Sequence, residues 1–132
     1  MRPSFVALVV PDVAEAARFC TEGLGLRPGR SATDWAFFDF GSLQLAVWSV
    51  AAWRHETGLD APPPAGATTL SINHGDRAAW DAAVDRAIHA GAVVLRRAAA
   101  AGPLPDRVWL RCPAGHVWEL ALDRAPTHKA SV

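Results

Sequence analysis

The chain of 132 residues lacks the features that define several large protein classes. Its two cysteines, Cys20 and Cys112, have neither CxxC nor Cys/His metal spacing, which excludes a disulfide-rich scaffold and a cysteine metal site. We expect both to be reduced packing residues. Thirteen basic residues balance thirteen acidic residues without clustering, so nucleic acid and anionic membranes are not expected as partners.

Long apolar segments are also missing. No run approaches the roughly 18 residues that a membrane-spanning helix needs, and no basic stretch followed by an apolar segment opens the chain. We therefore expect a cytoplasmic protein. What the chain does have is 51% hydrophobic and 20% charged residues, a composition typical of a single folded domain.

The first half of the chain predicts a strand, a helix and then further strands. Residues 5–10 are consecutive apolar residues stopped by a proline, which predicts a buried strand. A capping box that begins at Asp12 predicts a helix, which the glycines within residues 23–25 would end. Residues 35–40 and 43–48 flank a Gly-Ser turn and predict a hairpin.

The second half repeats this order after residues 51–66, whose three consecutive prolines predict an irregular connector. Residues 68–73 predict a strand, and Asp76 is a good N-cap for the helix that follows. The core-facing stripe expected on that helix is Trp80, Ala83, Val84, Ala87 and Ile88. Three further strands are predicted at 93–97, 108–111 and 117–122, with an irregular loop at 98–105.

Constant offsets relate the two halves, which is the signature of an internal repeat. The helix caps Asp12 and Asp76 differ by 64 in residue number, and Trp35 and Trp109 differ by 74. The predicted fold class is therefore α+β, built from two tandem βαβββ modules. The predicted organisation is one domain with module one at 4–50, the connector at 51–66, module two at 67–123 and a tail at 124–132.

The most specific motif lies near the C-terminus. Residues 111–120, Arg-Cys-Pro-Ala-Gly-His-Val-Trp-Glu-Leu, resemble the Asp-Pro-x-Gly-x-x-x-Glu-Leu turn and strand of the glyoxalase / bleomycin-resistance / extradiol-dioxygenase group, the vicinal oxygen chelate superfamily. Cys112 stands where that family usually has Asp. The resemblance spans about residues 4–123 and implies a curved eight-stranded sheet around a cleft, with helices outside. It also implies a homodimer, which would cover exposed sheet edges.

Strand alternation assigns side chains to faces without reference to the family. In residues 117–122, Glu119 alternates with Trp118 and Leu120, and an ionised carboxylate buried under a helix without a partner would cost several kcal/mol. The face that carries Glu119 is therefore expected to line the cleft. By the same parity, the candidate ligand-binding residues are Phe5, Trp35, Phe37, Gln44, Trp48, Thr69, Ser71, Asn73, Trp109, Arg111 and Glu119, with Trp53 beside them in the connector.

The resemblance also implies where a metal would bind. Metal-dependent members carry a His on the first strand of each module and a Glu or Gln on the last, and the matching positions here are Phe5, Gln44, Thr69 and Glu119. Both histidines are missing, and one carboxylate with one carboxamide falls short of the three protein ligands typical of catalytic zinc. We predict no metal and no cofactor.

None of the five histidines stands at a family ligand position. We expect them to be solvated loop or surface residues, two of which, His55 and His74, could reach the mouth of the cleft. The remaining three are His89, His116 and His128.

Aromatic walls with a few polar anchors are typical of small-molecule pockets. We predict a metal-independent protein that binds a flat aromatic or conjugated compound between Trp35, Trp48 and Trp109, like the family's antibiotic-sequestering resistance proteins. The alternatives are a metal-free isomerase, cyclase or lyase with Glu119 as acid or base, an atypical metal-dependent glyoxalase-like or dioxygenase-like enzyme, and a regulatory or interaction module with a vestigial cleft. The charge of Glu119 has three possible uses: pairing with Arg111, binding a cationic or hydrogen-bond-donating ligand, or general base catalysis.

Overall fold

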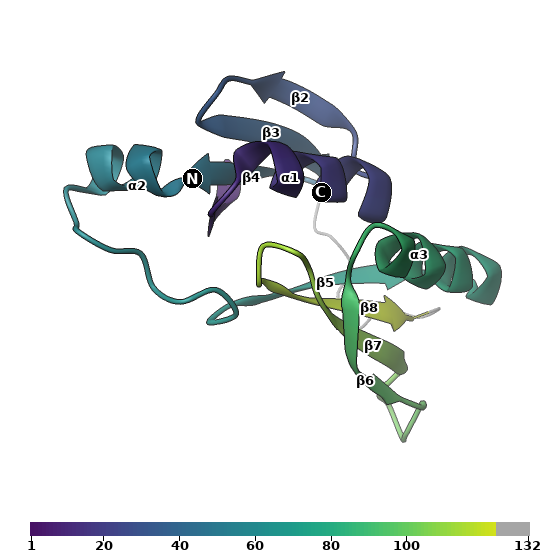
Figure 1. Cartoon of the computed structure of the whole chain (residues 1–132). Coiled ribbons are helices and arrows are strands. Elements are labelled where there is room, and N and C mark those ends of the chain that lie inside the picture. Colours follow the sequence, from purple (N-terminus) through teal and green to yellow (C-terminus); the bar gives the residue numbers. More distant parts are fainter. Residues whose placement is uncertain (124–132) are drawn as a thin grey trace.

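The computed structural model describes residues 1–123 and contains the same succession of elements twice (Figure 1). Module one consists of β1 (Phe5–Val10), α1 (Val13–Arg18), the π-helical turn η1 (Phe19–Gly23), β2 (Pro28–Ser31), β3 (Trp35–Phe40) and β4 (Leu43–Ser49). Module two consists of β5 (Thr69–His74), α3 (Arg77–His89), β6 (Val93–Ala98), β7 (Asp106–Arg111) and β8 (Val117–Leu122). The helix α2 (Val50–Thr57) lies between them. The predicted tail, 124–132 with His128, lies outside the described residues.

The eight strands form two four-stranded sheets with the same topology. The order is β1-β4-β3-β2 in the N-terminal sheet and β5-β8-β7-β6 in the C-terminal sheet. In each sheet the first strand pairs parallel with the last, and the other pairs are antiparallel. The predicted α+β class with two βαβββ modules and eight strands is confirmed. The strands do not form the single eight-stranded sheet that was expected, because β1 to β4 and β5 to β8 pair only within their own module.

Side-chain caps start both module helices where the sequence predicts. The carboxylate of Asp12 accepts from the Glu15 amide at 3.0 Å, and the carboxylate of Asp76 accepts from the Ala79 amide at 2.8 Å. After a turn and a half, α1 widens into η1. The helix of module one is therefore less regular than its counterpart α3.

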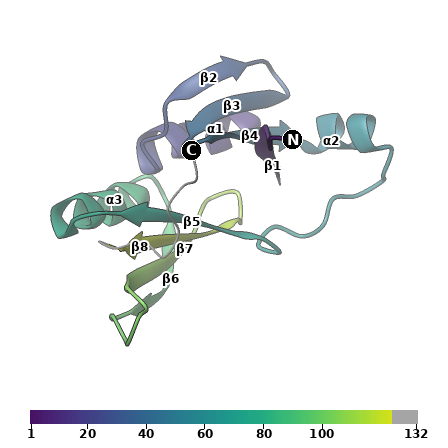
Figure 2. The same cartoon turned by 180° about the vertical axis from the view of Figure 1, so that it is seen from behind.

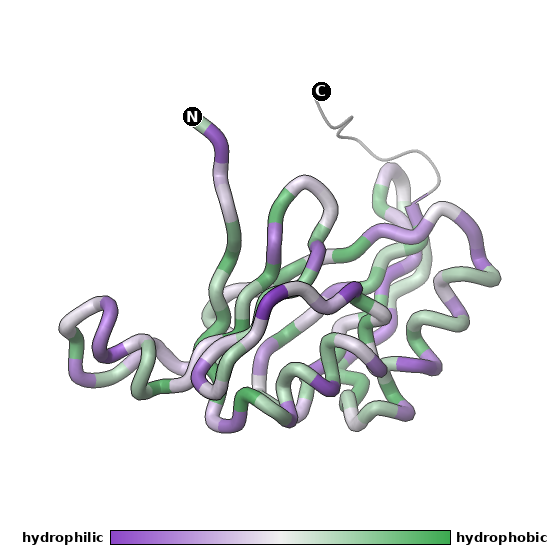
Figure 3. The backbone as a smooth tube through the Cα atoms, turned by 90° about the horizontal axis from the view of Figure 1, so that it is seen from above, coloured by the Kyte–Doolittle hydropathy of each residue, from purple (hydrophilic) through white to green (hydrophobic). Residues whose placement is uncertain are grey.

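The two sheets share one hydrophobic core on their helix-covered faces. The rings of Phe40 on β3 and Trp118 on β8 lie 6.1 Å apart, and α3 packs against η1. Leu45 of the N-terminal sheet and Leu110 of the C-terminal sheet are fully buried in this core. The other face of each sheet therefore points away from the shared core. Apolar and polar residues are interspersed along the backbone of both modules (Figure 3).

The prediction that residues 51–66 are wholly irregular is wrong. The Ser49 hydroxyl accepts from the Ala52 amide at 3.0 Å and starts α2, which Gly58 ends in a left-handed conformation at φ 73°. The prolines begin only after this point, so they do not interrupt the helix. The connector then runs outside both sheets to β5 (Figure 2).

Ile88 is a second correction, since it is 39% exposed instead of belonging to the core stripe of α3. Ile88 follows Trp80 by eight residues, and at about 100° per residue its side chain is rotated by about 80° from that of Trp80 after two full turns. It therefore lies at the edge of the stripe. The other four predicted stripe residues are buried. Within residues 1–123, no helix is long and apolar enough to cross a membrane. The cytoplasmic location stays a prediction.

Candidate ligand-binding faces

Four aromatic side chains gather on the outward face of the N-terminal sheet, and we call this group the aromatic face: Phe5, Trp35, Phe37 and Trp48. The ring of Phe5 lies 5.2 Å from Phe37 and 5.9 Å from Trp48, and Trp35 lies 5.5 Å from Phe37. Strand pairing explains the grouping, because Trp35 on β3 is directly opposite Trp48 on β4.

Two of the aromatic rings cover Ala46, which lies on the same face of the sheet. Phe5 and Phe37 stand on strands that flank β4, roughly 9.6 Å apart at the backbone, yet their centroids are 5.2 Å apart. Both rings therefore lean across β4, where Ala46 faces outward and is 0% exposed. Phe5 itself remains 40% exposed, so the cluster keeps apolar area at the surface. A hollow open to solvent beside it is lined by Arg30, Trp35, Phe37 and Gln44.

The outward face of the C-terminal sheet is mainly polar, and its central residues form what we call the polar face: Ser71, Arg107, Trp109, Arg111 and Glu119. Glu119 lies directly between Ser71 on β5 and Trp109 on β7 in the strand register. The Ser71 hydroxyl donates to its Oε1 at 3.2 Å. Thr69 and Asn73 flank Ser71 on the exposed strand β5.

Two arginines lie against the indole of Trp109. The guanidinium carbon of Arg107 is 4.9 Å from the ring centroid and that of Arg96 is 5.8 Å from it. Arg111 donates instead to the Gly115 carbonyl at 3.1 Å. Within residues 1–123, Arg111 and Glu119 do not form an ion pair, which was one of the three possible uses of the Glu119 charge.

The two-residue period of the strands predicts which face carries Arg107, but it does not predict the face of Arg96. Arg107 precedes Trp109 by two residues in a regular strand, so it must share its face. Arg96 reaches the same face because a register shift between Val94 and Arg96 changes the alternation of β6. No pattern in the sequence marks that irregularity.

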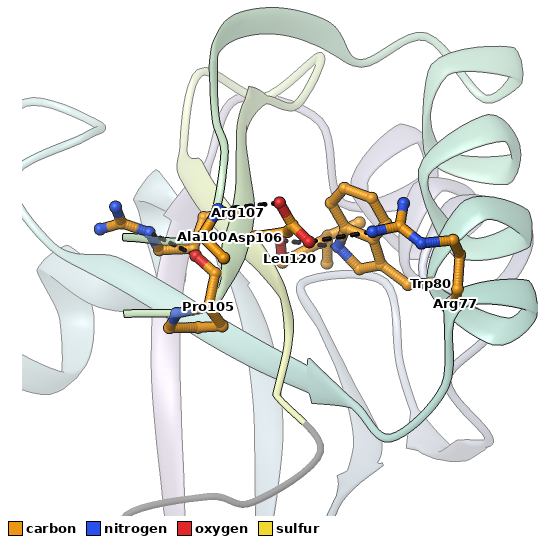
Figure 4. Close-up of polar contacts among 7 residues, drawn as sticks. All are labelled: Arg77, Trp80, Ala100, Pro105, Asp106, Arg107 and Leu120. Atoms are coloured by element: carbon orange, nitrogen blue, oxygen red, sulfur yellow. Dashed lines mark hydrogen bonds and ion pairs between the residues drawn. The ribbon is translucent and has the colours of Figure 1, made fainter. Parts of the chain in front are cut away.

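A polar network holds the start of β7 (Figure 4). Arg77 at the start of α3 forms a 2.9 Å ion pair with Asp106, and the second carboxylate oxygen of Asp106 accepts from the Ala100 amide at 2.9 Å. The next residue, Arg107, donates from Nε to the Pro105 carbonyl at 3.2 Å. The network fixes the backbone from which Arg107 reaches Trp109.

The structure separates the predicted site residues into these two faces. The aromatic face and the polar face lie on different sheets, and no ring contact within residues 1–123 joins Trp35 or Trp48 to Trp109. Trp53, on α2, lines a different hollow together with Val9, the prolines of 62–64 and His116.

The side chains at the family's metal positions do not make a metal site. Phe5 has no donor atom and packs against Phe37, while Gln44 is on the same sheet and Thr69 and Glu119 are on the other. Among residues 1–123, no three His, Cys, Asp or Glu side chains are grouped so as to hold a metal ion.

His116 corrects the expectation of solvated histidines. It is 9% exposed, and its Nε2 lies 2.8 Å from the Val9 carbonyl, because the turn before β8 folds back against β1. His74 follows the parity of the core side of β5, and its buried Nε2 has no hydrogen-bond partner. Burial lowers the pKa of His74, with a further lowering by Arg86 and an opposing effect of Asp76. His55 and His89 are exposed.

Cys20 and Cys112 are free and buried, as expected. Burial, with a smaller contribution from Cys112, raises the pKa of the Cys20 thiol to about 12. Cys20 is therefore a packing residue and not a nucleophile.

Comparison with known proteins gives structural matches only. No protein-family model and no curated protein matches the chain. A glyoxalase-related enzyme from Fulvimarina pelagi is similar at a TM-score of 0.87 and 25% identity, over 98% of this chain and 94% of that chain. Lactoylglutathione lyase from Agrobacterium tumefaciens has a TM-score of 0.74 at 18% identity, over 96% of this chain and 97% of that chain. The fosfomycin resistance protein FosX from Mesorhizobium loti has a TM-score of 0.67 at 13% identity, over 92% of this chain and 91% of that chain. The resemblance drawn from the sequence is thus confirmed, and this chain has the fold of the glyoxalase / bleomycin-resistance / extradiol-dioxygenase superfamily.

Proposed function

We propose that the protein binds a flat aromatic or conjugated small molecule without a metal ion. The observation that carries this proposal is the aromatic face, where four rings cluster on an outward sheet surface and Phe5 remains 40% exposed. Such rings add apolar area and edge-to-face contacts for a planar ligand. The absence of donor atoms at Phe5 supports binding without metal chemistry.

We propose further that two chains assemble the complete site. The aromatic face and the polar face point away from the core that they share within one chain, so a ligand touching both needs a second chain. The strands β1 and β5 are edges of their sheets, and a homodimer that brings β1 of one chain near β5 of its partner would cover both. Each dimer would then hold two equivalent clefts.

A mixing experiment tests this arrangement. Trp35→Ala removes a ring from the aromatic face, and Trp109→Ala removes one from the polar face, so each variant alone has two damaged clefts per dimer. In a heterodimer of the two variants, one cleft carries both changes and the other is intact. After unfolding and refolding an equal mixture, about a quarter of the clefts should bind a naphthalene probe with wild-type affinity. Refolded single variants serve as controls.

Several outcomes would contradict the proposal. A cleft within one chain would show no recovery on mixing, and a sedimenting species of 14.1 kDa at micromolar concentration would exclude the dimer. Loss of binding on Trp53→Ala alone would move the site to the hollow beside the connector. If a bound compound were turned over and Glu119→Gln lowered the rate by about 100-fold with binding retained, the enzyme alternative would replace simple binding.

A further inference from the structure

The polar face carries an excess of positive charge. Arg96, Arg107 and Arg111 lie on it with Glu119 as the carboxylate, which gives three positive charges against one. In the strand register Arg96 is opposite Trp109, and the other two arginines precede and follow Trp109 by two residues. The aromatic face has no such excess at its centre.

These arginines have no carboxylate partner within the part of the chain that is described. The one ion pair within 4.0 Å there joins Arg77 to Asp106, and Glu119 accepts from Ser71. Two guanidinium groups that share one indole repel each other, and the one carboxylate of the polar face, Glu119, lies opposite Trp109 in the strand register. One carboxylate cannot balance three arginines, so the polar face keeps a net positive charge.

The side chain of Arg107 is held in position before any ligand arrives. Its Nε donates to the Pro105 carbonyl at 3.2 Å, and its guanidinium carbon lies 4.9 Å from the Trp109 centroid. Its terminal N–H groups form no other hydrogen bond within residues 1–123. A guanidinium held against a ring keeps its N–H edge free to donate, and that edge matches the two oxygens of an oxyanion.

We infer that the ligand carries an oxyanion, a carboxylate, sulfonate or phosphonate, which Arg107 and Arg96 bind beside Trp109. The planar part of the same molecule would then contact the aromatic face contributed by the partner chain. This inference rests on the proposed function and names the chemical class of its ligand.

Two probes of the same shape and different charge test the inference: 2-naphthoate and 2-naphthamide. Titrations followed by tryptophan fluorescence should show that the wild-type dimer binds the anion at least about tenfold more tightly, since charge-assisted hydrogen bonds contribute more than neutral ones. Arg107→Gln should lower naphthoate affinity about tenfold and leave naphthamide affinity within about twofold, and Arg96→Gln should act in the same direction.

The chain provides a matched control in Arg97. It is exposed and adjacent to Arg96, but it pairs with Val108 on the other face of β6, so Arg97→Gln removes the same charge without touching the site. Its naphthoate affinity should equal that of the wild type. Thermal unfolding of each variant checks that the fold is retained, and Arg107→Lys, which keeps the charge but loses the planar fork, should fall between wild type and Arg107→Gln.

Equal wild-type affinities for the two probes would overturn the oxyanion and leave the aromatic binder intact. Equal losses on Arg107→Gln and Arg97→Gln would also overturn it, because general charge attraction would then explain the preference. If neither probe bound, the proposed function itself would fail.

Discussion

The two modules share one backbone topology and carry different outward surfaces. On the core side both present large apolar residues, such as Phe38 in one and Leu110 in the other. On the outward side one presents clustered rings and the other presents arginines with a carboxylate. Core residues must pack against a helix in both modules, whereas outward residues need only be compatible with a strand. The two modules can therefore keep the same backbone fold while their outward surfaces differ.

Strand register separates the modules further. Gln44 lies opposite Phe5, and the residue that matches Phe5 in the repeat is Thr69. Glu119 lies opposite Ser71, which is two residues further along β5 than Thr69. The turn before β8 is longer than the Gly41-Ser42 turn, which allows this shift. The carboxylate of module two is therefore not placed as the carboxamide of module one is, and this asymmetry adds to the mismatch with a metal site.

Substitution on the two faces of the C-terminal sheet should separate packing from binding most sharply. Trp118 is 1% exposed in the shared core, so Trp118→Ala should cost about 3–5 kcal/mol of stability. Trp109→Ala on the polar face should cost less than half of that. Denaturant unfolding measures both, and equal losses would show that the polar face is part of the core.

Substitution of the outward tryptophans should have its larger effect on ligand affinity and not on stability. Trp35→Ala and Trp109→Ala should each weaken binding of a planar probe by roughly 1–3 kcal/mol, the range for losing a large contact. Fluorescence titration gives the dissociation constants, with Ile88→Ala as an exposed apolar control far along α3. Unchanged affinity in both tryptophan variants would refute the aromatic site.

The helix caps should behave alike in the two modules. Asp12→Ala and Asp76→Ala should each destabilise the protein by about 1 kcal/mol, because each leaves a first-turn amide without its acceptor. Unfolding in urea measures the two losses, and the isosteric Asn variants should recover most of them. A much larger loss at Asp76 would mean that the longer helix α3 dominates stability.

The ion pair at the start of β7 should have a smaller and unequal effect. Arg77 and Asp106 are 54% and 24% exposed, so Arg77→Ala should cost less than about 1 kcal/mol. Asp106→Ala should cost more, since it also removes the acceptor of the Ala100 amide. Comparing these variants with the double variant isolates the pair, and equal single losses would deny the second role of Asp106.

His74 should produce the smallest effect, a slope of stability with pH. Its pKa is lowered in the folded protein, so below the unfolded value of about 6.5 the unfolded chain binds more protons. Its contribution is therefore complete above that pH and is lost as the pH falls toward the folded pKa. His74→Gln should reduce the slope of the unfolding free energy with pH, measured by denaturant unfolding between pH 7 and 5, while His89→Gln should not. Identical slopes in the wild type and His74→Gln would contradict the prediction.

Local interactions in the sequence account for the elements that were predicted correctly. Asp12 and Asp76 begin their helices because a carboxylate three residues before a free amide caps it whatever lies around it. Strand alternation likewise assigns Trp48 and Glu119 to outward faces, since the pleat has a period of two. The helix α2 was not predicted, because the prolines beyond it dominate the composition of residues 51–66 and the capping role of Ser49 was not recognised.

The sequence by itself determined the repeat, the fold and the outward position of most candidate residues, because caps, turns and the pleat act over a few residues. Only the tertiary structure decided which of these residues meet. It joined the sheets through Phe40 and Trp118, placed the aromatic face and the polar face on different sheets, and buried His116 against β1. It also brought Arg96 to Trp109 through an irregular strand. Such contacts depend on how distant segments pack, and no local pattern specifies that packing.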